Sequence, residues 1–181
     1  MKHLVPSLRM LAVFTLLTGM IYPLVVTGLA RALFPTQSAG SLVFDAGGNQ
    51  PVGSALLAQK FTQPKYFWPR PSAGDFATLP SGASNKGPTS VDLVKAIADN
   101  REKFGAAAPV DLLTASGSGL DPHVSPAAAL LQAARVADTR KIPRERIETL
   151  VKKFIEPPQL GLFGEPRVNV LLLNRALDEM R

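Results

Sequence analysis

The residues best able to do chemistry gather in one short stretch, TASGSGLDPHVSP, from Thr114 to Pro126. Ser118 lies in a Gly-Ser-Gly turn and is followed closely by Asp121 and His123, which supplies the three side-chain types of nucleophilic catalysis. A nucleophile elbow needs glycine two residues on either side of the serine, whereas here the glycines are its immediate neighbours. A hydrolase using Ser118 and His123 is therefore an alternative that the sequence leaves open.

The same turn offers a second chemistry, anion binding, because its backbone N–H groups stand ahead of a helix predicted to begin near Ser125. The stretch lacks the Gly-Lys-Ser/Thr of a P-loop and the third glycine of a dinucleotide fingerprint. The favoured interpretation is structural: the glycines make a tight turn, Asp121 closes it and Ser125 caps the helix. The weak anion-binding candidates are Ser116, Gly117, Ser118 and Gly119.

The composition argues against metal and nucleic-acid chemistry. The chain has no cysteine and two histidines, of which only His123 lies beyond the N-terminal tail, so no metal-ligand spacing exists. The formal net charge is +6, but residues 32–181 hold 17 Lys or Arg against 14 Asp or Glu, interspersed along the chain. This mildly basic, mixed surface predicts no nucleic-acid partner, and no motif predicts a bound cofactor.

An uncharged run from Met10 to Ala30 indicates a membrane-spanning helix ahead of these residues in the sequence. A helix of that length covers about 30 Å, the hydrocarbon thickness of a bilayer. A secretory signal cleaved after Ala32 is the alternative, but a signal's apolar core is shorter and Arg31 fits the cleavage site poorly. The sequence predicts a tail over residues 1–9, a transmembrane helix over 10–31 and a folded domain over 32–181.

The span has features beyond those of a simple tether. Small residues let membrane helices approach closely, and a proline kink is tolerated where neighbouring helices satisfy the freed carbonyl. Positive charge precedes the span at Lys2 and Arg9, with only Arg31 after it, which predicts a cytoplasmic N-terminus and an extracytoplasmic domain. The predicted helix-packing residues are Gly19, Tyr22, Pro23 and Gly28.

The domain itself is predicted to mix short strands with helices, an α+β or small α/β fold. A Gly-Gly-Asn turn within residues 40–53 predicts a hairpin, and residues 62–90, rich in Pro, Gly and Ser, predict a long functional loop. The remaining predictions are a helix over 90–103 with Val91, Val94, Ile97 and Ala98 on one face, a strand over 110–114, and helices beginning near Ser125, Pro143 and Arg167.

Within the long loop, Tyr66, Phe67 and Trp68 followed by Arg70 form the densest aromatic patch. Such residues anchor protein interfaces, and they equally pack in cores. Together with Asn85 in the same loop, Tyr66, Phe67 and Arg70 are the predicted partner contacts of the domain.

Four stretches together resemble one family, the C subunit of the bacterial Kdp potassium-transporting ATPase. The resemblance covers essentially the whole chain, because the layout also agrees: one N-terminal span, a hairpin and the stretch GSALLAQKF (53–61) come first. The stretches are YFWPRPSA (66–73), SGASNKGPTS (81–90), DLLTASGSGLDPHVSPAAALLQAARVA (111–137) and GEPRVNVLLLNRALD (164–178).

The resemblance implies an accessory subunit in the bacterial inner membrane, partnered by lipid, a channel-like potassium-binding subunit and a P-type ATPase subunit. The chain lacks the Asp-Lys-Thr-Gly-Thr phosphorylation motif, so it is not predicted to hydrolyse ATP itself. The resemblance also implies a catalytic chaperone that raises the ATP affinity of the ATPase subunit. An extracytoplasmic domain would not meet cytoplasmic ATP, so ATP is expected to be bound by the ATPase subunit and not by this chain.

Overall fold

The computed structural model describes residues 3–45 and 47–180. The chain forms two compact units, residues 1–42 and 43–181, and each is described by itself. Residues 1 and 2 of the predicted tail, Ala46 in the predicted hairpin and the C-terminal Arg181 lie outside the described residues.

The first unit is dominated by one apolar helix, Leu4–Leu33, of 30 residues, within which an 18-residue stretch has a mean hydropathy of 2.0. It is long and apolar enough to cross a membrane, and it begins six residues before the uncharged run. Among the described residues it is the one helix of this kind. Its segments are α1 (Leu4–Leu16), the π-helical η1 (Leu17–Ile21) and α2 (Tyr22–Leu33), followed by the short α3 (Pro35–Ser38).

The π-helical turn η1 lies directly before Pro23. Proline has no N–H to give to the carbonyl of Gly19, and its ring crowds that carbonyl in a regular α-helix. We attribute the wider turn to this clash, since π turns locally shift the hydrogen-bond ladder. The Thr18 hydroxyl, within the same turn, donates to the carbonyl of Phe14 at 2.7 Å.

The second unit opens with the predicted hairpin, which is confirmed. Strands β1 (Leu42–Phe44) and β2 (Pro51–Ser54) pair as a two-stranded sheet, and the Asp45 carboxylate accepts hydrogen bonds from the backbone of Asn49 and Gln50 in the turn. The described residues from 55 to 90 contain neither helix nor strand, which confirms the long loop.

Helix α4 (Val91–Phe104) confirms the helix predicted over residues 90–103. Ser90 caps its start by accepting from the backbone N–H of Leu93, and Gly105 ends it at φ +92°. The predicted apolar face is largely exposed: Val91 and Val94 are 81% and 61% exposed, Ala98 is exposed as well, and only Ile97 is half-buried. Because apolar residues stand on several sides of this helix, periodicity alone did not identify the packed side, on which Leu93 and Phe104 are half-buried.

The predicted strand over 110–114 is wrong, since Val110–Leu113 forms a short helix, α5. A four-residue apolar run carries no periodicity that separates a strand from one helical turn. The helix predicted from Arg167 is wrong for its first three residues: Arg167–Asn169 is strand β5, and the Asn169 side chain then caps α8 (Val170–Glu179) by accepting from the N–H of Leu172.

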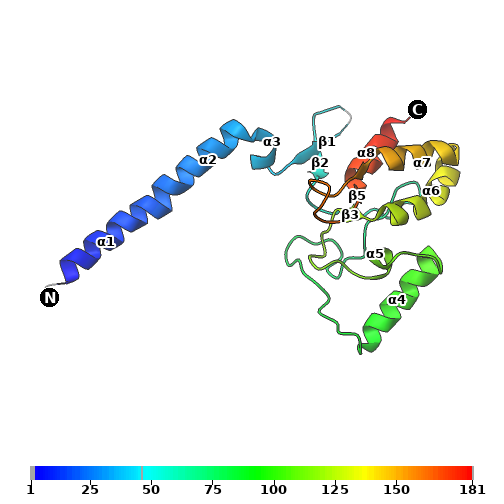
Figure 1. Ribbon diagram of the computed structural model, residues 1–181, viewed down its shortest axis with the longest axis horizontal. Coiled ribbons are helices and arrows are strands. Elements are labelled where there is room, and N and C mark those ends of the chain that lie inside the picture. Colours follow the sequence, from blue (N-terminus) through cyan, green and yellow to red (C-terminus); the bar gives the residue numbers. More distant parts are fainter. Residues whose placement is uncertain (1–2, 46, 181) are drawn as a thin grey trace. The chain divides into compact units, whose positions relative to one another are not determined.

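The core of this unit lies between a small antiparallel sheet and three helices. Strand β5 is central, flanked by β3 (His123–Val124) and β4 (Ile155–Glu156), and Val168 faces both Val124 and Ile155 in register. Helices α6 (Pro126–Arg140) and α7 (Arg144–Lys153) confirm two predicted helices, and with α8 they gather beside the sheet, while α4 stands away from it (Figure 1). This mixed architecture confirms an α+β domain after a single apolar helix. Fully buried members of the core include Phe67, Leu112, Val136, Ile147, Val168, Leu173 and Leu177.

Candidate functional site

Two buried amide side chains hold the aromatic segment in place. Asn174 of α8 accepts from the N–H of Phe67 at 2.8 Å and donates to its carbonyl at 2.9 Å. Gln132 of α6 does the same for Trp68, at 2.8 and 3.1 Å. Both amides are almost completely buried. They replace the partner strand that this irregular backbone lacks, so its buried polar groups remain paired.

Next to this clamp, two cations lie over the Trp68 ring. The Arg135 guanidinium is 3.8 Å from the indole centroid and the Lys103 ammonium is 4.3 Å from it. Arg135 also donates to the carbonyls of Pro64 and Tyr66, which ties α6 to the segment. Burial lowers the pKa of Arg135 to about 10. Burial, and then repulsion from Arg135, lower the pKa of Lys103.

The far end of the segment is fixed by a charged pair. The Tyr66 hydroxyl donates to Asp178 at 3.0 Å, and Arg140 donates to the other oxygen of the same carboxylate at 2.6 Å. Arg140 also donates to the carbonyl of Lys65 at 2.8 Å. The whole Tyr66–Trp68 stretch is therefore a rigid part of the domain despite having no regular secondary structure.

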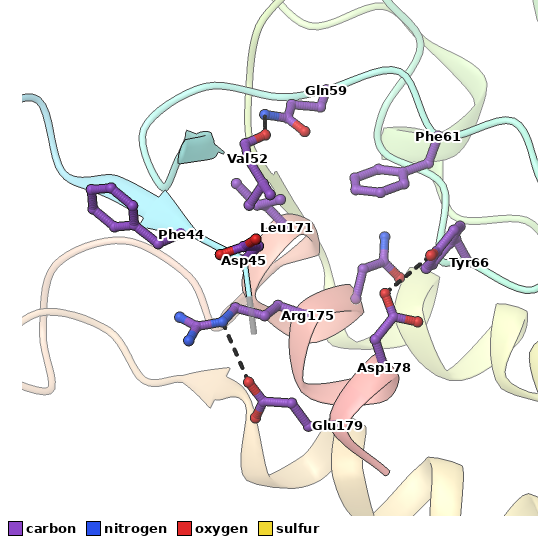
Figure 2. A pocket seen from close by; sticks show the side chains of 11 residues that line it. Phe44, Asp45, Val52, Gln59, Phe61, Tyr66, Leu171, Arg175, Asp178 and Glu179 are labelled. Carbon is purple, nitrogen blue, oxygen red and sulfur yellow. Dashed lines mark hydrogen bonds and ion pairs between the residues drawn. The ribbon is translucent and has the colours of Figure 1, made fainter. Parts of the chain in front are cut away.

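A cavity of about 550 Å³ opens between the β1–β2 hairpin, the segment around Phe61 and helix α8. Figure 2 shows Tyr66 directed at Asp178, and Arg175 paired with Glu179, whose atoms are 3.4 Å apart. The size of this cavity suits a small ligand or an inserted side chain. Since these carboxylates already have partners, the cavity offers shape and an apolar wall rather than a reactive group. Its apolar lining residues are Phe44, Val52, Phe61 and Leu171.

Several polar groups of the Gly-Ser-Gly turn form hydrogen bonds within the domain. The N–H of Ser116 donates to Pro71 and that of Gly119 donates back to Ser116. The Ser118 hydroxyl accepts from the N–H of Leu120 at 3.1 Å. Gly119 has φ +71°, and a side chain there would meet the carbonyl of Gly82 at 2.9 Å, so glycine is required. Anion binding by Ser116–Gly119 stays a prediction that these contacts do not favour.

Asp121 and His123 belong to a group of polar contacts with Arg70 rather than to a catalytic pair with Ser118. Asp121 accepts from Arg70 at 3.0 Å and from the backbone of His123, and the His123 ring lies 3.6 Å from the same carboxylate. Burial raises the pKa of Asp121, but hydrogen bonds from His123 and Arg70 outweigh it and hold the pKa below its usual value. Across the described residues, no hydrogen bond joins Ser118 to His123.

The remaining predicted partner residues are spread over the chain. Phe67 is fully buried, so its side chain belongs to the core. Arg70 is partly buried against Asp121, whereas Asn85 is exposed in the loop at φ +53°. The span candidates Gly19, Tyr22, Pro23 and Gly28 are exposed on the apolar helix. Partner contact at these positions stays a prediction.

Sequence reasoning missed Gln132, Arg135 and Asn174. Gln132 and Asn174 are polar residues inside apolar helical runs, AAALLQAARVA and VLLLNRALD. A polar residue on the buried face of an amphipathic helix must find a partner, and that signal could have singled them out. It could not have named the partner, because Asn174 lies 107 residues from Phe67 along the chain.

Comparison with known proteins gives one consistent result. The family model described as KdpC: K+-transporting ATPase, c chain, matches residues 4–179. The potassium-transporting ATPase KdpC subunit of Rhodospirillum rubrum is 53% identical over 189 residues, covering 99% of this chain and 96% of its own length. The subunit of the same name from Cereibacter sphaeroides is 50% identical, covering 98% and 97%, and that from Geobacter metallireducens is 48% identical, covering 99% of both.

Proposed function

The chain belongs to the KdpC family, the c chains of K+-transporting ATPases, and from this premise we propose that it is an accessory, non-hydrolysing subunit that assembles or stabilises its complex. Membership makes it a membrane-associated subunit of a potassium-transporting ATPase. The observation that carries the proposal is the match over residues 4–179, because it includes both the apolar helix and the folded domain.

The chemistry of the domain supports an accessory role. Its polar residues are engaged in holding the chain together: Asn174 and Gln132 clamp the aromatic segment, and Asp121 is bound to Arg70. A hydrolase would need the Ser118 hydroxyl to donate to a base, and among the described residues this hydroxyl accepts from Leu120 while no hydrogen bond joins it to His123. A rigid domain whose described residues pair no nucleophile with a base suits binding to other subunits better than catalysis.

The partners in this proposal are the channel-like potassium-binding subunit and the P-type ATPase subunit of the same complex. The apolar helix would pack against their membrane helices through Gly19 and Gly28. Among the described residues, nothing lies within 4 Å of where a Cβ atom would stand at these two glycines. The positive charge ahead of the uncharged run, at Lys2 and Arg9, supports a cytoplasmic N-terminus and an extracytoplasmic domain.

The test is affinity purification of the tagged full chain in mild detergent, with mass spectrometry of the proteins that come with it. A polytopic protein and a P-type ATPase recovered at a fixed ratio are the expected result. Recovery of the chain alone across several detergents would contradict the proposal. A Gly19→Leu/Gly28→Leu chain should lose the partners if the span packs closely, whereas Leu24→Ala at an exposed position should keep them.

The same preparation tests the catalytic-chaperone role that the resemblance implies. ATP hydrolysis by the complex is measured with and without this chain over a range of ATP concentrations. A chaperone lowers the KM for ATP, whereas a purely assembling subunit changes only the amount of intact complex and leaves KM unchanged.

A further inference from the structure

The loop joining β4 to β5 presents three large apolar side chains to solvent (the orange-brown loop ahead of β5 in Figure 1). Leu160, Leu162 and Phe163 are 88%, 82% and 65% exposed. Single exposed leucines are ordinary, but three within four residues at the tip of one loop form a concentrated apolar patch. We call Leu160–Phe163 the apolar tip.

The apolar tip is held by a tight turn. The N–H of Gln159 donates to the carbonyl of Phe163 at 2.9 Å, and the N–H of Phe163 donates back to Gln159 at 3.0 Å. Gly161 sits at φ +73° in the turn, where glycine is favoured. The two ends of the loop are anchored in the sheet, because Glu156 on β4 pairs with Arg167 on β5, next to the buried Val168. Because the turn is already formed, binding through it costs little ordering of the backbone.

The chemistry around the apolar tip disfavours lipid as its occupant. Segments that rest in a membrane interface combine apolar residues with Trp or Tyr and with Lys or Arg. Residues 157–166, PPQLGLFGEP, contain none of these four, and Glu165 adds a negative charge. At the base of the loop, Arg167 is engaged with Glu156 at 2.9 Å.

The size of the patch disfavours a freely diffusing partner or a second copy of the chain. Three large side chains offer roughly 400–500 Å², whereas a stable interface between free proteins buries about 800 Å² per partner. A small contact becomes effective when both sides are held together by other means, because the effective concentration then reaches the order of millimolar. The apolar helix of this chain provides such a second attachment.

We propose that the apolar tip inserts into an apolar recess on another membrane-embedded subunit of the same ATPase. This rests on the proposed function, since it names the surface by which the domain holds its complex. The contact is a hydrophobic anchor surrounded by the polar groups of Gln159 and Glu165, the arrangement typical of an interface core and rim.

The experiment compares complexes purified with wild-type or variant full chains. Leu160→Ser/Leu162→Ser removes the apolar character of two highly exposed residues, and Val91→Ser/Val94→Ser makes a matched change on the exposed side of α4. The expected result is that the loop variant is lost from the immobilised complex about tenfold faster or more, while the α4 variant behaves as wild type. Circular dichroism checks that both variants keep the wild-type fold.

A second measurement identifies the occupant. The chain has no cysteine, so Leu162→Cys can carry a single polarity-sensitive fluorophore, with Val91→Cys as control. The proposal expects a blue shift for the Leu162→Cys probe only when the other ATPase subunits are present. A blue shift for the chain alone in lipid nanodiscs would assign the tip to lipid. A shift that grows with chain concentration in detergent would assign it to a second copy, and either result overturns the proposal.

The outcomes also separate this inference from the function on which it rests. If the wild-type chain fails to bring down any ATPase subunit, the proposed function and the inference fail together. If wild type and both variants are retained equally and the probe does not shift, the inference fails while the proposed function stands.

Discussion

Replacing Asn174 by leucine tests the amide clamp directly. The two side chains are similar in size, so the change removes hydrogen bonding without leaving a large void. The N–H and carbonyl of Phe67 would remain buried and lose their partners. At about 1–3 kcal/mol for each of the two unpaired groups, less roughly 1–2 kcal/mol recovered by burying leucine, the free energy of unfolding should fall by about 1–4 kcal/mol.

The assay is urea unfolding of the full chain in detergent micelles, followed by the fluorescence of Trp68. Trp68 is the only tryptophan of the chain and is adjacent to Phe67, so its emission reports on the clamped segment. Asn100→Leu is the matched control, because Asn100 is only partly buried in α4 and donates a single hydrogen bond, to Leu113. The control should lose about 1 kcal/mol or less. An Asn174→Leu chain no less stable than the control would refute the clamp.

Three further predictions use the same preparation. Arg135→Met should lower the free energy of unfolding by about 1–3 kcal/mol and change Trp68 emission. Arg135→Lys should show the same loss of stability and the same change in emission, because one ammonium cannot reach the carbonyls that the guanidinium spans. Ser118→Ala should lower the free energy of unfolding by less than about 1 kcal/mol and leave complex assembly and ATP hydrolysis by the complex unchanged. If this variant instead abolishes a hydrolytic activity of the chain itself, the hydrolase alternative is favoured. Because the pKa of Asp121 is lowered on folding, its stabilising contribution exists above the unfolded value of about 3.9 and is lost as pH falls through the folded pKa. Between pH 6 and pH 3 the melting temperature of the wild type should therefore fall more steeply than that of Asp121→Asn.

Some of the fold was readable from the sequence because the signals are local. The apolar helix follows from an uncharged run, and the starts of α4 and α6 follow from Ser90 and Ser125, whose hydroxyls accept N–H groups three residues later. The β1–β2 hairpin follows from its Gly-Gly-Asn turn. Where the local signal was too short, as at Val110–Leu113 and Arg167–Asn169, strand and helix were exchanged.

The candidate site divides in the same way. The sequence by itself determined that an apolar span precedes an α+β domain and that residues 66–70 concentrate aromatic side chains. Only the tertiary structure decided that Phe67 is core, that Gln132 and Asn174 hold the segment, and that Leu160–Phe163 is exposed. Helical periodicity and caps depend on neighbours within about four residues, whereas burial of Phe67 depends on a side chain 107 residues away, and no local pattern encodes that meeting.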